Sequence, residues 1–159
     1  MSDSKNFTPL SDIGYSEIIR QISNSSIRHA EHDIIQGMGD DCSVVRISND
    51  QVMLNHTAVF TEGVDFDLSY HAFPYLAYKS IASAISDFAA MNAKAETLQI
   101  GLSVPNRLSY EMLQEFFQGI NAACKEFELS LTGGDLNAGH KALCISLHLQ
   151  GRQKESEVV

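Results

Sequence analysis

The chain has 159 residues, of which 44% are hydrophobic and 19% charged, a composition that suits one globular domain with a sizeable core. Twenty acidic residues against 11 basic ones give a formal net charge of −9 at pH 7. This charge disfavours binding to nucleic acid and to anionic membranes, because both need basic side chains that face phosphate. Phosphate-containing ligands fit such a chain where divalent cations bridge carboxylate to phosphate.

The cysteines predict a reducing compartment. Cys42, Cys124 and Cys144 are scattered along the chain, and none belongs to a CxxC pair, so we expect buried thiols. Residues 1–11 are polar and lack the apolar segment of a signal peptide, and we expect a flexible leader there. Since no apolar run is long enough to span a bilayer, we expect a cytoplasmic protein without a membrane partner.

Hydrophobic periodicity and turn residues divide the chain into three helices and five strands. The expected helices cover residues 12–23, 74–93 and 109–128. The expected strands cover residues 42–47, 51–60 and 97–105, a stretch that starts at Leu129 and runs into a glycine-rich turn, and residues 141–151. Tight hairpins mixed with helices predict an α+β fold with a mixed, mainly antiparallel sheet.

The helix expected at 74–93 has an unusual polar face. Its apolar stripe follows helical spacing through Tyr78, Ile81, Ile85 and Phe88. On the other side, small residues surround the single carboxylate of Asp87. Small side chains allow a ligand or another backbone to approach closely, so this face is a candidate for binding.

Aspartates recur beside small residues at three separate places. Asp40 and Asp41 lie in "GMGDD", Asp87 in "ISDFAAM" and Asp135 in "TGGDLNAG", while Glu62 and Asp65 in "TEGVDFD" are further candidates. Hard cations such as Mg²⁺ bind carboxylates, waters and substrate phosphates. Adjacent glycines leave room for phosphate and expose backbone N–H groups. Metal-assisted phosphoryl transfer is the chemistry that this pattern would suit.

Each of these signals, taken singly, has a simpler explanation. Aspartate after glycine is common in turns, the Asp87 position could be a solvated helix position, and "TGGD" could be a tight turn. The chain has no P-loop GK[ST], no Rossmann fingerprint and no GxSxG elbow. Its histidines do not pair convincingly at metal-ligand spacing, so we expect them to be surface or core residues.

The combination of motifs is more specific than its parts. "GMGDDCSVV", the block from "TEGVDF" through "LAYKSIASAISDFAAM" to "GLSVP", and "LTGGDLNAG" occur in the order and spacing of the thiamine-monophosphate kinase family. From about Asp12 to Gly151 the chain resembles the ATP-binding N-terminal half of that family. Aminoimidazole ribonucleotide synthetase and selenophosphate synthetase share this fold. The resemblance implies an α+β domain over 12–159, with helices packed on one face of the sheet, and a homodimer.

The resemblance also implies a site. Phosphoryl transfer in the family runs from ATP to thiamine monophosphate and uses Mg²⁺. The implied metal ligands are carboxylates and one hydroxyl, from Asp40, Asp41, Asp87, Asp135 and Thr57. Gly134 and Asp135 would contact the ATP phosphates. No residue is assigned a catalytic role.

Three departures from the family pattern leave two hypotheses open. Ala58 stands where the family has the aspartate of a Ser/Thr-Thr-Asp motif, and Asp65 stands at the position of its substrate-contacting histidine. The resemblance also leads us to expect that the family's C-terminal domain is absent from this chain. The chain is therefore expected to be either the N-terminal half of a thiamine-monophosphate kinase or a catalytically impaired paralogue or fragment. In the second case it would act as a nucleotide-binding or dimerisation module.

Overall fold

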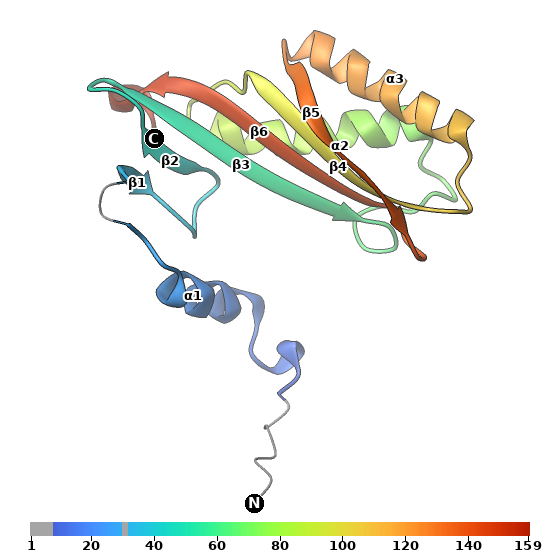
Figure 1. The fold of residues 1–159 in the computed structure, drawn as a ribbon, viewed down its shortest axis with the longest axis horizontal. Coiled ribbons are helices and arrows are strands. Elements are labelled where there is room, and N and C mark those ends of the chain that lie inside the picture. Colours follow the sequence, from blue (N-terminus) through green and yellow to red (C-terminus); the bar gives the residue numbers. More distant parts are fainter. Residues whose placement is uncertain (1–7, 30–31) are drawn as a thin grey trace, which may run out of the picture.

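The computed structural model describes residues 8–29 and 32–159 (Figure 1). Three helices and six strands form the fold, with two short 3-10 turns, η1 and η2. The helices are α1 (Tyr15–Ser25), α2 (Phe73–Ala90) and α3 (Tyr110–Glu126), and the turns are η1 (Leu10–Asp12) and η2 (Glu155–Glu157). The strands are β1 (Ile34–Gln36), β2 (Ser43–Arg46), β3 (Gln51–Thr61), β4 (Thr97–Pro105), β5 (Ser130–Gly139) and β6 (Cys144–Lys154).

All six strands form one mixed sheet in the order β1-β2-β3-β6-β4-β5. Four of its five neighbouring pairs are antiparallel, and only β4 and β5 run parallel. The long pair is β3 with β6, which is matched without a break from Gln51 opposite Lys154 to Thr61 opposite Cys144. The predicted α+β fold with a mixed, mainly antiparallel sheet is confirmed.

Helices α2 and α3 pack together on one face of this sheet (Figure 1). The structure places Pro74 in the first turn of α2, where its missing N–H costs nothing. Ser109 caps α3, as predicted, because its hydroxyl accepts a hydrogen bond from the N–H of Met112. The helices approach so closely that a Cβ on Gly119 would lie 2.2 Å from the carbonyl oxygen of Pro74.

The core lies between the sheet and α2. Ile145, Leu147 and Leu149 alternate along β6 and have no exposed surface, which confirms the predicted alternation. Each such side chain contributes about 1.5–3 kcal/mol through burial. Phe88 and Ile81 of α2 meet them from the helical side and are also fully buried.

The structure differs from the sequence predictions at three elements. Strand β1 was not expected. Strand β5 continues through the glycines that were expected to form a turn. Two of the small residues on the Asp87 side of α2, Ser80 and Ala84, are each only 1% exposed, so part of the face expected to be open lies inside the protein, while Asp87 itself stays partly exposed.

The N-terminal expectations are only partly within the described residues. The leader expected at 1–11 falls mostly on residues 1–7, which lie outside them, and Leu10–Asp12 form η1. Helix α1 is confirmed, but none of its residues is buried, and Figure 1 shows it apart from the sheet. In the part of the chain that the structure describes, no helix combines the length and apolarity needed to cross a bilayer.

Candidate functional site

The loop before β2 carries the first two predicted aspartates. Gly39 turns the chain with a φ of 112°, a conformation that favours glycine. The backbone N–H of Asp41 then donates to Oδ1 of Asp40 over 2.8 Å. One carboxylate therefore holds the turn, and both side chains belong to exposed residues at the start of a strand.

A histidine joins this loop to Asp87 of α2. His56 Nδ1 lies 2.7 Å from the backbone oxygen of Asp41, and its Nε2 lies 2.9 Å from Oδ2 of Asp87. The histidine side chain is 12% exposed and the Asp87 side chain 34%. The Nε2 contact is one of proximity alone, because this nitrogen has no aligned hydrogen-bond partner among the described residues. His56 thus occupies the space between two of the predicted metal ligands.

Cys42 follows Asp41 directly in the chain and is buried. The pKa of its thiol is raised to about 12. Burial is the largest cause, and the negative charges of Asp87, Asp41 and Asp40 add to it. All three carboxylates are therefore close enough to oppose a thiolate at this point. We call Asp40, Asp41 and Asp87 the acidic cluster.

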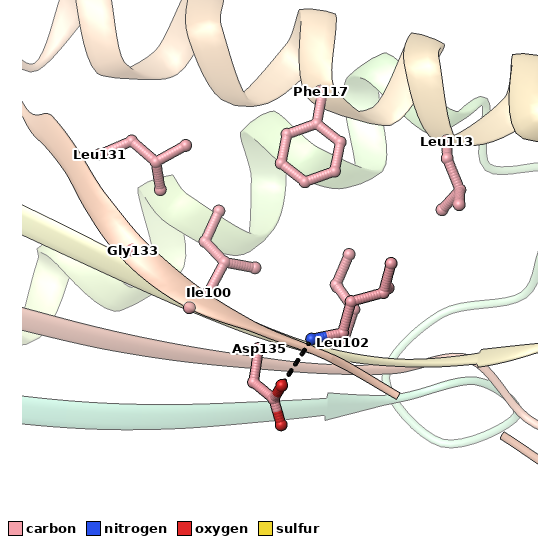
Figure 2. A pocket seen from close by; sticks show the side chains of 9 residues that line it. Ile100, Leu102, Leu113, Phe117, Leu131, Gly133 and Asp135 are labelled. Atoms are coloured by element: carbon pink, nitrogen blue, oxygen red, sulfur yellow. Dashed lines mark hydrogen bonds between the residues drawn. The ribbon is translucent and has the colours of Figure 1, made fainter. Parts of the chain in front are cut away.

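Gly134 and Asp135 lie on β5, at the edge of the sheet. A Cβ on Gly134, whose φ is 155°, would lie 1.9 Å from the carbonyl oxygen of Ile100, so only glycine fits. Asp135 pairs with Gly101 of β4 and accepts a hydrogen bond from the N–H of Leu136 over 3.0 Å. Figure 2 shows its carboxylate pointing away from Phe117 and the apolar groove under α3.

Thr57 faces a second histidine on the open side of the sheet. Its hydroxyl lies 3.1 Å from Nδ1 of His148, its partner on β6. Next to this pair is a hollow of about 500 Å³ on the sheet surface. Its lining includes Gln99, Gly101, Gly134, Asp135, Ser146 and His148.

Strand periodicity puts the predicted ligands on opposite faces. Along β3, His56 and Ala58 point to the helical side, because successive side chains alternate, and Thr57 points to the other. Asp135 shares the open face with Thr57, three strands away, which is roughly 14 Å at the usual strand spacing. The structure therefore brings Asp40, Asp41 and Asp87 together, and separates them from Thr57 and Asp135.

A preformed metal cage does not arise from these groups. Among residues 8–29 and 32–159, no three His, Cys, Asp or Glu side chains are grouped so that they could hold a metal ion. Magnesium, however, is usually held by one or two carboxylates together with substrate phosphates. Asp135 beside the hollow fits that mode, whereas the acidic cluster is already in contact with His56.

The remaining acidic candidates serve the local backbone. Oδ2 of Asp65 accepts a hydrogen bond from the N–H of Thr61 over 2.7 Å, and so closes the turn after β3. Glu62 accepts one from the N–H of Leu143 over 2.8 Å and pairs with Arg107. In the described structure both carboxylates already have partners outside the acidic cluster and the hollow.

Two functional candidates, His56 and His148, were missed at the sequence level. Both were expected to be ordinary surface or core residues, since neither lies at metal-ligand spacing from another histidine. The alternation of β3 carried a usable signal, because it places His56 on the same face as Ala58. Which residues lie opposite that face could be known only from the fold.

The fold and these motifs define an N-terminal domain of a known class. Residues 39–152 match the family of AIR synthase related proteins, N-terminal domain, and the chain belongs to this family. The match covers the sheet from the turn before β2 to β6, and thus both groups of aspartates. The predicted resemblance to this superfamily is confirmed.

Within the family, similar proteins are thiamine-monophosphate kinases. The enzyme of Rhodopirellula baltica is 30% identical over 122 residues, covering 72% of this chain and 39% of that protein. The Bacillus subtilis enzyme is 25% identical over 141 residues, covering 89% of this chain and 43% of its own length. The chain therefore spans about two fifths of the curated relatives that it matches.

The solved structures agree with the sequence comparison. The structure described as AaThiL complexed with AMPPCP and TMP matches 94% of this chain and 45% of its own, with a TM-score of 0.80 at 25% identity. Thiamine-monophosphate kinase from Stenotrophomonas maltophilia matches 90% of this chain and 42% of its own, with a TM-score of 0.63, also at 25% identity.

Proposed function

We propose that this chain is the ATP-binding N-terminal part of a thiamine-monophosphate kinase, with residues 12–159 as that domain. The reaction would transfer the γ-phosphoryl group of ATP to thiamine monophosphate and give thiamine diphosphate. The kinases that it resembles are about twice as long, so this activity would also need the part of those proteins that the chain does not match.

One observation carries the proposal. The backbone fold of 94% of this chain matches part of the structure described as AaThiL complexed with AMPPCP and TMP. The Gly134–Asp135 pair lies in this shared fold. Gly134 keeps β5 tight against β4, and Asp135 presents a carboxylate beside a hollow with Ser146 and His148. A Mg²⁺ ion shared by Asp135 and the nucleotide phosphates would supply the charge neutralisation that an acidic domain needs.

The open sheet face also supports a homodimer as part of this proposal. In the described residues, α2 and α3 cover one face of the sheet only, which leaves the side of Thr57 and His148 uncovered. A second copy laid against this face would shield its partly exposed strands. We place the protein in the cytoplasm, a proposal supported by the free thiols of all three cysteines.

A second candidate is a catalytically impaired relative that binds nucleotide without transferring phosphate. Ala58 supplies no carboxylate on the face of the acidic cluster, and Asp65 is engaged in its own turn. Ala58 and Asp65 stand at positions that the reaction would use. Neither departure changes Gly134 or Asp135. Nucleotide binding is thus common to both candidates, and turnover separates them.

Calorimetric titration of the chain with AMPPCP, with and without Mg²⁺, tests the shared step. We expect weak binding that depends on Mg²⁺ and that Asp135→Asn weakens at least tenfold. Glu115→Gln, which removes an exposed charge on α3, is the matched control and should bind like the parent. Absence of Mg²⁺-dependent heat at millimolar AMPPCP would refute nucleotide binding.

A turnover assay then decides between the candidates. A longer protein that includes this chain would be given ATP and thiamine monophosphate, and thiamine diphosphate would be measured. Product formation that is lost in Asp135→Asn supports the kinase. Nucleotide binding without product supports the impaired relative.

A further inference from the structure

We infer that the apolar groove under α3 holds the purine base of the nucleotide, while Asp135 serves the phosphates from the other side of β5. Six apolar side chains define this groove: Ile100, Leu102, Leu113, Phe117, Leu131 and Leu136. The assignment rests on the proposed function, because it names the part of the same nucleotide site that takes the base. The groove has a volume of about 460 Å³, within the roughly 300–1,000 Å³ typical of small-molecule sites.

The groove forms where a helical stripe faces an edge strand that carries two glycines. Leu113 and Phe117 are four residues apart on α3 and therefore lie on the same side of the helix. They face the sheet at Ile100, which is only 4% exposed and belongs to the floor of the groove. Gly133 and Gly134 of β5 contribute no side chain, and no further strand flanks β5 in the described part of the chain. The groove therefore stays open at the edge of the sheet.

The lining suits a flat, uncharged ring. Phe117 projects from α3 into the groove (Figure 2), and its ring meets that of buried Phe116 edge to face at 5.9 Å. Phe117 and Leu131 are still 38% and 41% exposed, which leaves apolar surface for a ligand to cover. Aromatic pairs gain energy beyond the area that they bury. Among the described residues of the lining, Asp135 alone is charged, and its carboxylate points away, so a cationic ring would find no counter-charge in the groove.

The groove shares residues with the Asp135 side of the sheet. Ile100, Gly134 and Asp135 line both the groove and the hollow on the open face. The strand between the two is the outermost of the sheet, and a Cβ on Gly133 would meet nothing within 4 Å. A nucleotide that crosses β5 at Gly133 would thus place its base against Phe117 and its phosphates at Asp135. This continuity favours a nucleotide over an apolar segment of another protein, which would not need the carboxylate.

Adenosine alone tests the groove without metal or phosphate. The side-chain resonances of Phe117 and Leu136 would be followed by NMR in the unaltered chain while adenosine is added in the absence of Mg²⁺. We expect shifts that saturate at millimolar adenosine for these two residues and not for Tyr75, an exposed aromatic residue of α2. Unshifted groove residues, or shifts with thiamine monophosphate and not with adenosine, would overturn the inference.

Variants separate the base from the phosphates. In calorimetry, Phe117→Ala should weaken Mg²⁺-dependent binding of AMPPCP at least tenfold, the loss expected when a base loses an aromatic partner. The same variant should bind tripolyphosphate with Mg²⁺ like the parent, because this probe has no base. Gly133→Leu should also weaken AMPPCP binding, since its side chain has room in the fold and would obstruct the crossing. Tyr110→Ala, which removes an exposed ring of α3 outside the groove, is the matched control and should bind like the parent.

The outcomes distinguish the base site from the proposed function. If folded Phe117→Ala and Gly133→Leu bind AMPPCP as tightly as the parent, the base lies elsewhere, and nucleotide binding still stands. If adenosine shifts the groove residues but AMPPCP shows no Mg²⁺-dependent binding, the groove binds the base and the proposed phosphate site at Asp135 fails. Circular dichroism of each variant shows whether it is folded.

Discussion

Gly134→Ala tests the close packing of β5 on β4. The new Cβ would lie 1.9 Å from the oxygen of Ile100 and 2.7 Å from its carbonyl carbon. To reach an ordinary contact, β5 must move away from β4 by about 1.5 Å, which strains the ladder on both sides of Asp135. Overpacking costs about 1–3 kcal/mol and an L-residue at positive φ about 1–2 kcal/mol. We expect a loss of about 3 kcal/mol.

Urea unfolding followed by circular dichroism measures this loss, and Gly133→Ala is the matched control. A Cβ on Gly133 meets nothing within 4 Å, so its substitution should change stability by less than about 1 kcal/mol in either direction. In thermal melts the Gly134 variant should fall by roughly 6–12 °C for a chain of this size. Equal effects at the two glycines would refute the packing of β5 described above.

Three further predictions concern the core, a buried thiol and a loop. Leu147→Ala should destabilise the protein by about 2–5 kcal/mol in the same unfolding assay, because its side chain is fully buried; a loss below 1 kcal/mol would contradict this. Cys42 should resist iodoacetamide at pH 8 in the folded state, judged by peptide mass spectrometry, since its pKa is raised to about 12. The raised pKa stabilises the fold fully below the unfolded value near 9, and this contribution is lost as the pH rises toward 12, so Cys42→Ala should flatten the alkaline decline in stability. Glu62→Gln should speed proteolysis between β5 and β6 by weakening the bonds to Leu143 and Arg107, whereas Glu115→Gln should not.

Much of the fold could be predicted because local signals agreed with it. The stripe of α2, the Ser109 cap of α3 and the alternation of β6 are properties of short segments. The start of strand β5 was predicted, but its continuation through the glycines was not, because glycines favour turns locally and only the pairing with β4 makes them extended. Strand β1 has three residues, which is too short for a periodic signal.

The candidate site was predictable in its chemistry and not in its geometry. The residue types and their spacing indicated carboxylates that act on phosphate through cations. Their division between two faces follows from β3, where Thr57 and Ala58 are neighbours in sequence and point to opposite sides. Contacts between distant segments, such as that of His56 with Asp87, need the tertiary fold. A shared motif therefore located the residues without showing which of them meet.

The most direct test of the account is a crystal structure of the chain with AMPPCP and Mn²⁺, with the ions located by anomalous scattering. We predict a peak between the nucleotide phosphates and Asp135. Nucleotide bound away from Asp135, or nucleotide bound there without a Mn²⁺ peak, would contradict the account.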